Sequence, residues 1–234
     1  MAELQELRRY RRDLHRIPEL DFDLPQTIAY IEGVLAPLTC DVTHPCPGCV
    51  CAFFDAGVGA AHATAIRADM DALPIAEATG AAFASTHSGK MHACGHDGHM
   101  AMALSAATFV DRTIREQPGA IKRNVLFVFQ PAEETTGGAK TVCESGVFER
   151  YGVDRIFGFH VWPDLPPARW RAAPVRCWRV RVRHTFISMA RASISLRPMA
   201  FRSRSRTMRR WRLQVLGFRA RAHGRVGCRR ALHW

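Results

Sequence analysis

The sequence predicts an α/β fold built on a doubly wound, mostly parallel sheet. Three observations carry this prediction. Apolar segments of strand length alternate with amphipathic segments of helical length, residues 124–130 form a continuous apolar run, and polar residues follow the carboxyl ends of the predicted strands. A strand that is apolar at every position is typical of a sheet covered on both faces. Strands that alternate with helices favour parallel order.

The chain begins with two predicted helices. Residues 2–17 place leucines at helical spacing, and Pro18 ends this helix. A second helix is expected over residues 25–35, because a proline stands at its first turn and apolar residues recur along one face. Short apolar strands are predicted next, at residues 50–54 and 63–68.

The same alternation continues downstream. A helix is expected from Met100 to about Arg112, and the apolar run at 124–130 is the predicted central strand. A short helix opened by two glycines should then run over residues 137–144, followed by a strand at 153–161. From the strand at 63–68 onward, each strand is thus separated from the next by a helix, as the crossover connections of a parallel sheet require.

Charge divides the chain near residue 167. Residues 1–167 contain all 21 acidic residues and 14 of the 33 Lys and Arg, whereas residues 168–234 contain 19 Arg and no Lys, Asp or Glu. No apolar run approaches the roughly 20 residues of a membrane span, and the charged start differs from a signal peptide. We therefore expect a cytoplasmic protein with no membrane partner, whose eight cysteines are thiols.

Side chains that bind metals gather in one short segment. They are His92, Cys94, His96, Asp97 and His99. Thiolate, imidazole and carboxylate groups bind zinc and other borderline-soft divalent ions. A His-rich loop with one buried thiol is the structural alternative, but a carboxylate pair and a late histidine elsewhere in the chain favour a metal site.

These further groups follow the carboxyl ends of predicted strands. Asp69 and Asp71 follow one strand, Glu133 and Glu134 follow the next, and His160 ends the last. Ligands of open α/β sheets bind beyond the carboxyl ends of the strands, so the three groups should converge on one site. For Asp69 and Asp71, support of the site competes with direct metal contact, and support is the preferred interpretation.

Four ordered motifs resemble the metal-dependent amidohydrolases of the aminoacylase/carboxypeptidase superfamily, in the branch of hippurate hydrolase, N-acyl-amino-acid amidohydrolase and the auxin-conjugate hydrolases. The motifs lie at residues 67–74, 91–99, 129–134 and 158–166, and residues 12–19 fit the same branch. We expect the resemblance to cover residues 1–167 and to stop there. It implies a zinc-peptidase-like catalytic domain, here incomplete: the lid and dimerisation domain is missing and one sheet edge is unpaired.

The resemblance also implies a site and a reaction. It assigns two divalent metal ions, zinc or manganese, to Cys94, His96, Glu134 and His160, with a further histidine ligand missing from this chain. Glu133 would act as the general base in hydrolysis of the amide bond of N-acyl amino acids or similar small conjugates. The residues expected to support the ligands from behind are Asp97, His99, Asp69 and Asp71, with simple packing as the alternative for His99. His15 and Glu19 are expected in capping or salt-bridge roles.

The Arg-rich segment 168–234 allows two interpretations. A basic arm would bind nucleic acid through phosphate contacts, which would make the protein a nucleic-acid binder with a non-catalytic hydrolase domain. A frameshift in a GC-rich gene also explains the excess of Arg, Ala, Pro, Gly and Trp. We prefer the second interpretation and expect a truncated, inactive chain with an out-of-frame, disordered tail, a small-molecule substrate class and no nucleic-acid partner. Full-length relatives would be homo-oligomeric through the missing domain.

A Cys-x-x-Cys pair at Cys46 and Cys49 stands outside these motifs. Such a pair can be a redox motif or half of a zinc site. Because no second pair follows at a suitable spacing, and because proline and glycine surround it, we interpret it as a structural turn between strands.

Overall fold

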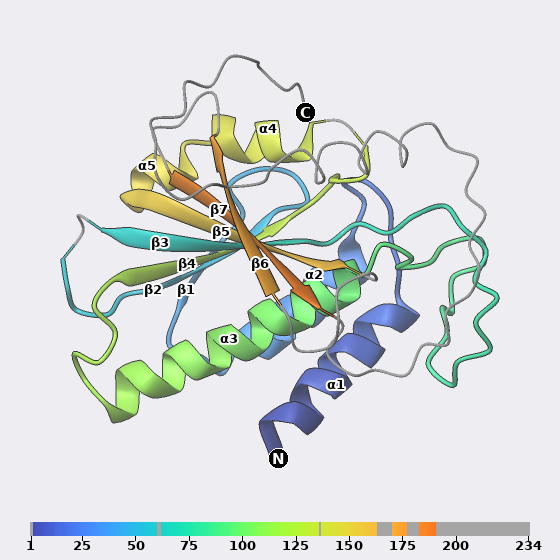
Figure 1. Cartoon of the computed structure of the whole chain (residues 1–234), viewed down its shortest axis with the longest axis horizontal. Coiled ribbons are helices and arrows are strands. Elements are labelled where there is room, and N and C mark those ends of the chain that lie inside the picture. Colours follow the sequence, from blue (N-terminus) through green and yellow to red (C-terminus); the bar gives the residue numbers. More distant parts are fainter. Residues whose placement is uncertain (1, 60–61, 136, 163–169, 177–182, 191–234) are drawn as a thin grey trace. The chain divides into compact units, whose positions relative to one another are not determined.

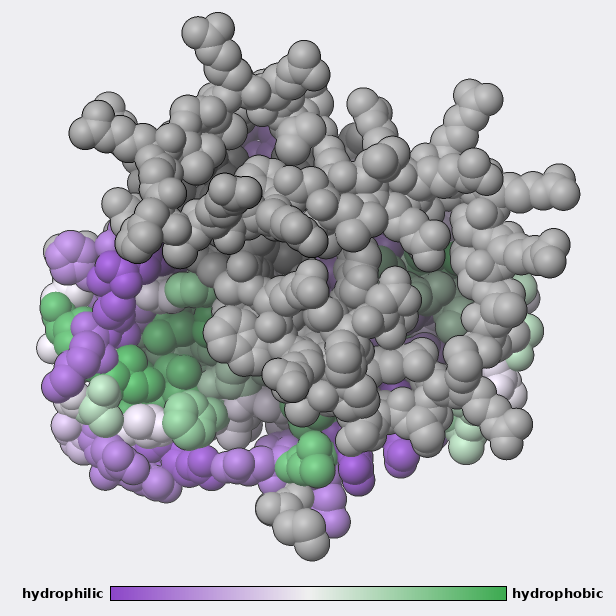
Figure 2. Space-filling view, in the orientation of Figure 1, coloured by the Kyte–Doolittle hydropathy of each residue, from purple (hydrophilic) through white to green (hydrophobic). Residues whose placement is uncertain are grey.

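The computed structural model describes residues 2–59, 62–135, 137–162, 170–176 and 183–190. All of them lie in one compact unit, Met1–Ile194. Within this unit a seven-stranded sheet has helices on both of its faces (Figure 1). Figure 2 shows that the described part of the surface visible in this orientation mixes hydrophilic and hydrophobic residues.

The helices and strands follow the predicted alternation. The helices are α1 (Ala2–Arg16), α2 (Pro25–Leu35), α3 (His96–Glu116), α4 (Gly138–Glu144) and α5 (Val147–Arg150). The strands are β1 (Asp41–Thr43), β2 (Val50–Phe54), β3 (Ala63–Asp69), β4 (Asn124–Gln130), β5 (Val153–Trp162), β6 (Trp170–Arg176) and β7 (Arg183–Ala190). None of the helices in the described ranges is long and apolar enough to span a membrane.

The strand order of the sheet is β1-β2-β4-β3-β5-β7-β6. The four consecutive strands β4, β3, β5 and β7 run parallel to one another. The outer strands pair in the antiparallel sense, β1 with β2, β2 with β4, and β6 with β7. The predicted α/β class with a mostly parallel open sheet is therefore confirmed.

Strand β4 shows why the sheet needs two helical layers. All seven of its residues are buried. Val125, Phe127 and Phe129 join the core beneath α1, α2 and α3, whereas Leu126 and Val128 join a second core with residues of α4 and α5. Because side chains alternate between the faces of a strand, a strand covered on both sides must be apolar throughout.

Two expectations about the later part of the chain need correction. The structure places strands β6 and β7 inside the segment expected to be disordered. Strand β7 pairs with β5 from Arg155 to Trp162, so this side of β5 is not the unpaired edge that we expected. The rest of residues 168–234 lies outside the described residues, and the division of the chain at residue 167 stays a prediction.

Helix α3 begins four residues earlier than predicted, at His96 instead of Met100. Gly95 precedes it in the left-handed region, with φ of 95°. The first turn of α3 therefore contains His96 and His99, which the sequence interpretation had placed in a loop. Because α3 begins at His96, the amino terminus of this helix, the longest one described, lies at the carboxyl edge of the sheet.

Candidate metal centre

The parallel strands bring the predicted site residues to one edge. Strand β3 lies between β4 and β5, and all three run in the same direction. Asp69 and Asp71 at the end of β3 therefore lie beside Glu133 and Glu134 after β4, and beside His160 near the end of β5. The predicted convergence of the three groups is observed.

Gly95 is required by the close approach of α3 to β5. A Cβ atom at this position would lie 2.5 Å from Cγ2 of Val161, which is far inside van der Waals contact. The positive φ also disfavours any L side chain. A glycine here lets the segment with Cys94 and His96 turn tightly against the strand that carries His160.

His96 presents one ring nitrogen to the site. Its Nδ1 lies 2.7 Å from the backbone carbonyl oxygen of Asp71. A carbonyl only accepts hydrogen bonds, so Nδ1 carries a proton, and in the neutral ring Nε2 holds the lone pair. The residue is 1% exposed, and Nε2 has no hydrogen-bond partner among the described residues. A buried acceptor left in this way needs a cation or a donor.

Three further donor atoms surround that nitrogen. Oε1 of Glu134 is also buried without a hydrogen-bond partner among the described residues, and it lies 3.7 Å from His96 Nε2. Ligand atoms of Cys94, His96 and Glu134 lie within 4.8 Å of one another. His160 places Nε2 3.6 Å from Cys94 Sγ, while its Nδ1 donates to the carbonyl of Val161 at 2.7 Å. A thiol, two imidazoles and a carboxylate are a donor set that fits a borderline-soft divalent metal.

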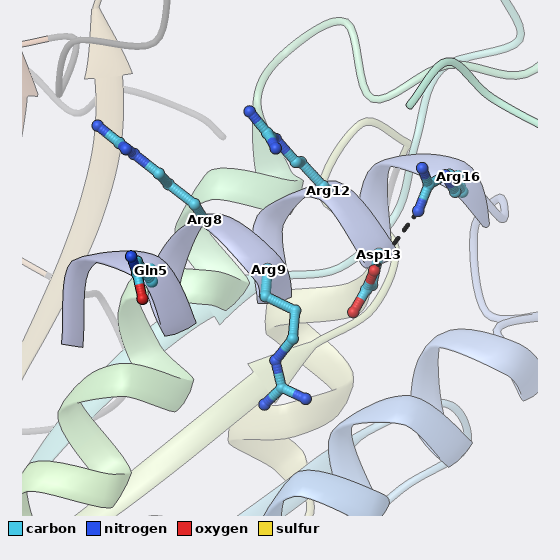
Figure 3. Close-up of a pocket in the computed structure, with 6 residues that line it drawn as sticks. All are labelled: Gln5, Arg8, Arg9, Arg12, Asp13 and Arg16. Atoms are coloured by element: carbon cyan, nitrogen blue, oxygen red, sulfur yellow. Dashed lines mark ion pairs between the residues drawn. The ribbon is translucent and has the colours of Figure 1, made fainter. Parts of the chain in front are cut away.

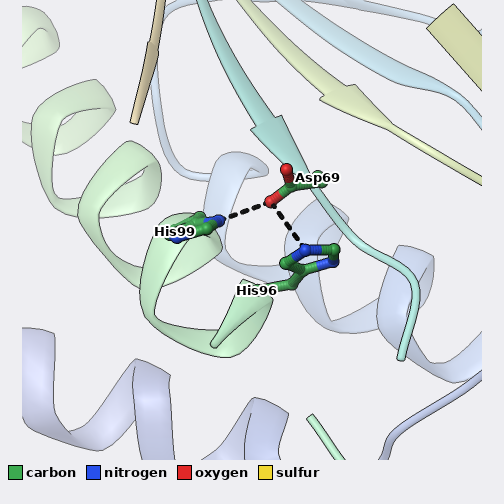
Figure 4. A group of neighbouring side chains, drawn as sticks. All are labelled: Asp69, His96 and His99. Atoms are coloured by element: carbon green, nitrogen blue, oxygen red, sulfur yellow. Dashed lines mark hydrogen bonds and ion pairs between the residues drawn. The ribbon is translucent and has the colours of Figure 1, made fainter. Parts of the chain in front are cut away.

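Figure 4 shows the rings of His96 and His99 side by side next to Asp69. The two rings nevertheless differ in their hydrogen bonds. The backbone N–H of Val161 donates to Nε2 of His99 at 2.9 Å. The ring proton must then sit on Nδ1, which donates to Oδ1 of Asp69 at 2.5 Å. Both nitrogens are thus occupied. Although Asp69, His96 and His99 also form a compact group, His99 has no lone pair left for a metal.

Asp71 supports the two glutamates through their backbone. Its Oδ1 accepts the N–H of Glu133 at 2.8 Å, and its Oδ2 accepts the N–H of Glu134 at 2.9 Å. Asp69 is held by His99 and by Arg67, whose NH1 lies 2.8 Å from Oδ2. Asp69 and Asp71 thus both have contacts that are typical of residues supporting a site.

Charge accumulates around His96. Burial lowers the pKa of His96, but the carboxylates of Asp69, Glu133, Asp71 and Glu134 outweigh burial and raise it. Such a concentration of carboxylates around one buried ring favours a bound cation. The pKa of Glu133 is also raised, first by burial and then by the charge of Asp69.

The other two ligand candidates are both held in their neutral forms. Burial, followed by the nearby His99, lowers the pKa of His160 to about 4. Burial and the charge of Glu134 raise the pKa of the Cys94 thiol. The neutral imidazole is a ready ligand, whereas the thiol must lose its proton before it binds a metal.

Asp97, the residue next to His96 in the sequence, belongs to a buried chain of ion pairs. Arg11 donates to Oδ2 of Asp97 at 2.9 Å, and Nδ1 of His15 lies 2.8 Å from the same oxygen. His15 reaches Glu77 through its other nitrogen at 3.3 Å. His15 therefore has the salt-bridge role that we expected. Glu19 caps α2, because its carboxylate accepts the N–H groups of Gln26 and Thr27.

Sequence interpretation missed two residues near the centre. Arg67 joins Asp69 to Gln130, whose Oε1 accepts from its Nε at 2.9 Å. The sequence did contain a signal for Arg67, since it is the one arginine inside an otherwise apolar strand. His92 is 3% exposed, and neither ring nitrogen has a hydrogen-bond partner among the described residues. It was noted in the cluster but was given no role.

The fold and this centre define an α/β protein with a candidate metal site at the carboxyl edge of its sheet. Residues 65–211 match the family described as Peptidase family M20/M25/M40. The chain belongs to this family. The match continues past residue 167, so our expectation that the resemblance stops there was wrong.

Curated relatives and solved structures agree with this assignment. The chain is 42% identical over 164 residues to an uncharacterized hydrolase of Staphylococcus aureus (strain USA300), covering 70% of this chain and 42% of that protein. It is 41% identical over 161 residues to the N-acetyldiaminopimelate deacetylase of Streptococcus uberis, covering 67% and 41% of the two chains. The structure of the Bacillus subtilis YXEP protein, a dinuclear metal-binding peptidase of the M20 family, matches with a TM-score of 0.67 and 38% identity, covering 74% and 48%. The chain thus spans less than half the length of these relatives.

Proposed function

We propose that this chain provides the metal-binding part of a hydrolase that cleaves the amide bond of N-acyl amino acids or similar small conjugates. One observation carries the proposal. His96 Nε2 and Glu134 Oε1 are buried acceptors without hydrogen-bond partners among the described residues, and they face one another at 3.7 Å. The N-acetyldiaminopimelate deacetylase relative supports the substrate class, because its name describes removal of an acyl group from an amino acid.

The proposed ligands are Cys94, His96, Glu134 and His160. Two divalent ions, zinc or manganese, would polarise the amide carbonyl and lower the pKa of the attacking water when bound. The protein's own part is to hold the ligands in place. Asp71 does this twice, through the carbonyl that fixes the His96 ring and through the carboxylate that holds the backbone of both glutamates.

Glu133 is the proposed general base. Its Oε2 lies 3.8 Å from His96 Nε2, and its side chain keeps 26% of its surface exposed. It is therefore next to the ligands while still open to substrate and water. In the proposed reaction its carboxylate takes a proton from the attacking water and then gives that proton to the departing amine.

A nucleic-acid binder was the alternative, and nothing in the family assignment supports it. Most of the Arg-rich segment lies outside the described residues. On α1 a shallow hollow is lined by Gln5, Arg8, Arg9, Arg12, Asp13 and Arg16 (Figure 3). Two of these arginines pair with acids of the same helix, Arg9 with Glu6 at 3.7 Å and Arg16 with Asp13 at 3.6 Å, which reduces the positive charge offered to phosphates.

The proposal can be tested in two stages. The purified 234-residue chain should bind zinc or manganese, as measured by titration calorimetry and elemental analysis, and a chelator should remove the metal. Because the chain spans less than half of its relatives, we expect this chain alone to show no turnover. Metal-dependent turnover by the chain would contradict that expectation without affecting the proposed reaction.

The reaction itself is tested in a chimera. Residues 1–162 replace the matching part of the Streptococcus uberis relative, and release of amino acids from N-acetyl- and N-benzoyl-amino acids is followed. We expect chelator-sensitive turnover, which Glu133→Gln lowers by about 10²–10⁴-fold while the bound metal stays. A folded, metal-loaded chimera without turnover would contradict the proposed reaction. An unchanged rate in the Glu133→Gln chimera would remove Glu133 from the role of base.

A further inference from the structure

Three cysteines gather where β1 turns into β2, away from the proposed ligands. The backbone N–H of Cys49 donates to the carbonyl of Cys46 at 3.1 Å and closes a turn. Sγ of Cys49 lies 3.9 Å from Sγ of Cys51. Cys46 is partly exposed, whereas Cys49 and Cys51 are fully buried, and all three are free thiols.

The turn holds Cys46 and Cys49 at a separation that a disulfide can bridge. The first and fourth residues of a β-turn have Cα atoms less than about 7 Å apart, and disulfides join Cα atoms about 4.4–6.8 Å apart. Cys49 and Cys51 are two residues apart along an extended segment, and both are shielded from solvent. Cys46 is therefore the thiol of this cluster that a dissolved reagent meets first, with Cys49 as its nearest partner across the turn.

The local chemistry also distinguishes the two sulfurs. The thiol of Cys49 hydrogen-bonds to Cys46, which lowers the pKa of Cys46 more than burial raises it. The same bond, followed by contact with Cys51 and burial, raises the pKa of Cys49. A partly exposed thiol with a lowered pKa beside a protonated thiol has the arrangement of an attacking and a resolving cysteine.

We propose that Cys46 and Cys49 form an oxidation site, at which a hydroperoxide converts the two thiols into an intrachain disulfide. The Cys46 thiolate attacks the peroxide, the O–O bond breaks, and an alcohol or water leaves, so that Cys46 becomes a sulfenic acid. The sulfur of Cys49 then displaces the hydroxyl group, which leaves as water with the proton of the Cys49 thiol. One peroxide is reduced, and two thiols are oxidised to one S–S bond.

The position of this turn makes the modification relevant to the rest of the fold. A Cβ atom at Gly48, between the two cysteines, would lie 2.8 Å from the carbonyl oxygen of Phe22 and 3.2 Å from Cβ of Pro131. Pro131 begins the segment that carries Glu133 and Glu134. The disulfide would therefore form in a turn that packs against Pro131, two residues before Glu133.

The test uses the full chain, reduced, desalted and then treated with one equivalent of hydrogen peroxide. Remaining thiols are alkylated, and the tryptic peptide 17–67, which contains Cys40, Cys46, Cys49 and Cys51, is analysed by mass spectrometry. We expect the oxidised peptide to carry two alkyl groups instead of four, and to be two hydrogens lighter than a reduced peptide with two alkyl groups. Reduction followed by a second alkylation should bring the number to four.

Two variants and one control assign the pair. Cys46→Ser should keep all three remaining thiols of the peptide alkylated, and Cys49→Ala should leave a sulfenic acid on Cys46 that dimedone traps. Cys40→Ser is the matched control and should still form the disulfide. Four alkyl groups in the treated wild type, or a disulfide that persists in Cys46→Ser, would overturn the proposal. A thermal melt of each variant checks folding, and the wild-type result decides the question if a variant is unfolded.

Discussion

His96 and His99 lie on the same turn of α3, and the difference between their surroundings separates a candidate ligand from a structural residue. Both are buried, at 1% and 0% exposure, and both lie close to Asp69. At His99 the N–H of Val161 and the carboxylate of Asp69 occupy both ring nitrogens. At His96 the Asp71 carbonyl fixes the proton on Nδ1 and leaves Nε2 facing Glu134.

The comparison teaches that burial and residue type do not identify a ligand, whereas unpartnered acceptors that face one another, as His96 Nε2 and Glu134 Oε1 do, mark a candidate pair of ligands. A buried polar atom without a partner costs free energy in the folded protein. Among the proposed ligands, His96 Nε2 and Glu134 Oε1 bear that cost. The bonding of His99 is complete without a metal, so its contribution is to the stability of the junction between α3, β3 and β5.

The largest expected effect comes from exchanging the two histidines for alanine in turn. His96→Ala should weaken zinc binding by more than about 100-fold, since loss of a ligand should exceed the 10–100-fold cost of losing an outer partner. His99→Ala should lower the free energy of unfolding of the metal-free chain by about 3 kcal/mol, and by more than His96→Ala does. Titration calorimetry and urea unfolding measure the two quantities.

The exposed His44, which pairs with Glu32 at 2.7 Å, provides the control. His44→Ala should leave zinc affinity unchanged and alter stability by less than about 0.5 kcal/mol. If His99→Ala abolished metal binding in a folded chain while His96→Ala did not, the assignment of the two rings would be reversed.

Gly95 provides the next largest effect, because it lets α3 and β5 approach. Gly95→Ala combines a positive φ with a Cβ atom 2.5 Å from Val161, so we expect a loss of about 2–4 kcal/mol in the free energy of unfolding. Gly98→Ala is the matched control, since its Cβ would lie 3.9 Å from Val161 within the helix. It should be neutral or slightly stabilising. Equal melting temperatures for the two variants would refute the close approach.

Asp71→Asn tests support of the ligands by backbone contacts. One oxygen of the new amide still accepts a glutamate N–H, but its NH₂ group faces the other. We expect zinc affinity to fall by about 10-fold to 100-fold, and stability to fall by about 1–2 kcal/mol. Asp41→Asn, on the exposed strand β1, should change neither. An unaltered zinc affinity in Asp71→Asn would show that the backbone of Glu133 and Glu134 is held by other means.

Much of the fold could be predicted from sequence because periodicity and burial coincide. The apolar run of β4 predicted a strand covered on both faces, and the structure buries all seven residues. The start of α3 could not be predicted in this way, because it depends on Gly95 meeting Val161, a residue of another strand. Strands β6 and β7 were also missed, since an arginine-rich composition without acids or lysine gave no reason to expect a sheet.

The site could be predicted only as a set of residue types. Cys94, His96, Glu134 and His160 were named from motifs, and the structure brings them together. The residue pattern alone could not separate His96 from His99, because the partners that occupy His99 lie 30 and 62 residues away along the chain. Only the family resemblance named His96 as a ligand and His99 as a supporting residue. The same limit applies to Asp71, whose contact with the backbone of Glu133 spans 62 residues.

The smallest expected effect concerns His15, which lies behind the ligands. Burial lowers its pKa, but the hydrogen bond and charge of Asp97, together with Glu77, outweigh burial and raise the pKa above 6.5. Arg11 and His92 complete the charged and titratable surroundings. Because the folded pKa is the higher one, protonated His15 stabilises the fold fully below about pH 6.5, and this contribution is lost as pH rises through the folded pKa.

The measurement is urea unfolding of the wild type and His15→Gln, with a chelator present, from about pH 6 to pH 9. We expect the difference in free energy of unfolding between the two proteins to shrink as pH rises, since glutamine does not titrate. The exposed His44→Gln is the control and should change the free energy of unfolding by less than about 0.5 kcal/mol. If the difference for His15 grew with pH, the ring would be held neutral in the fold, and the Asp97 ion-pair chain would depend on Arg11 alone.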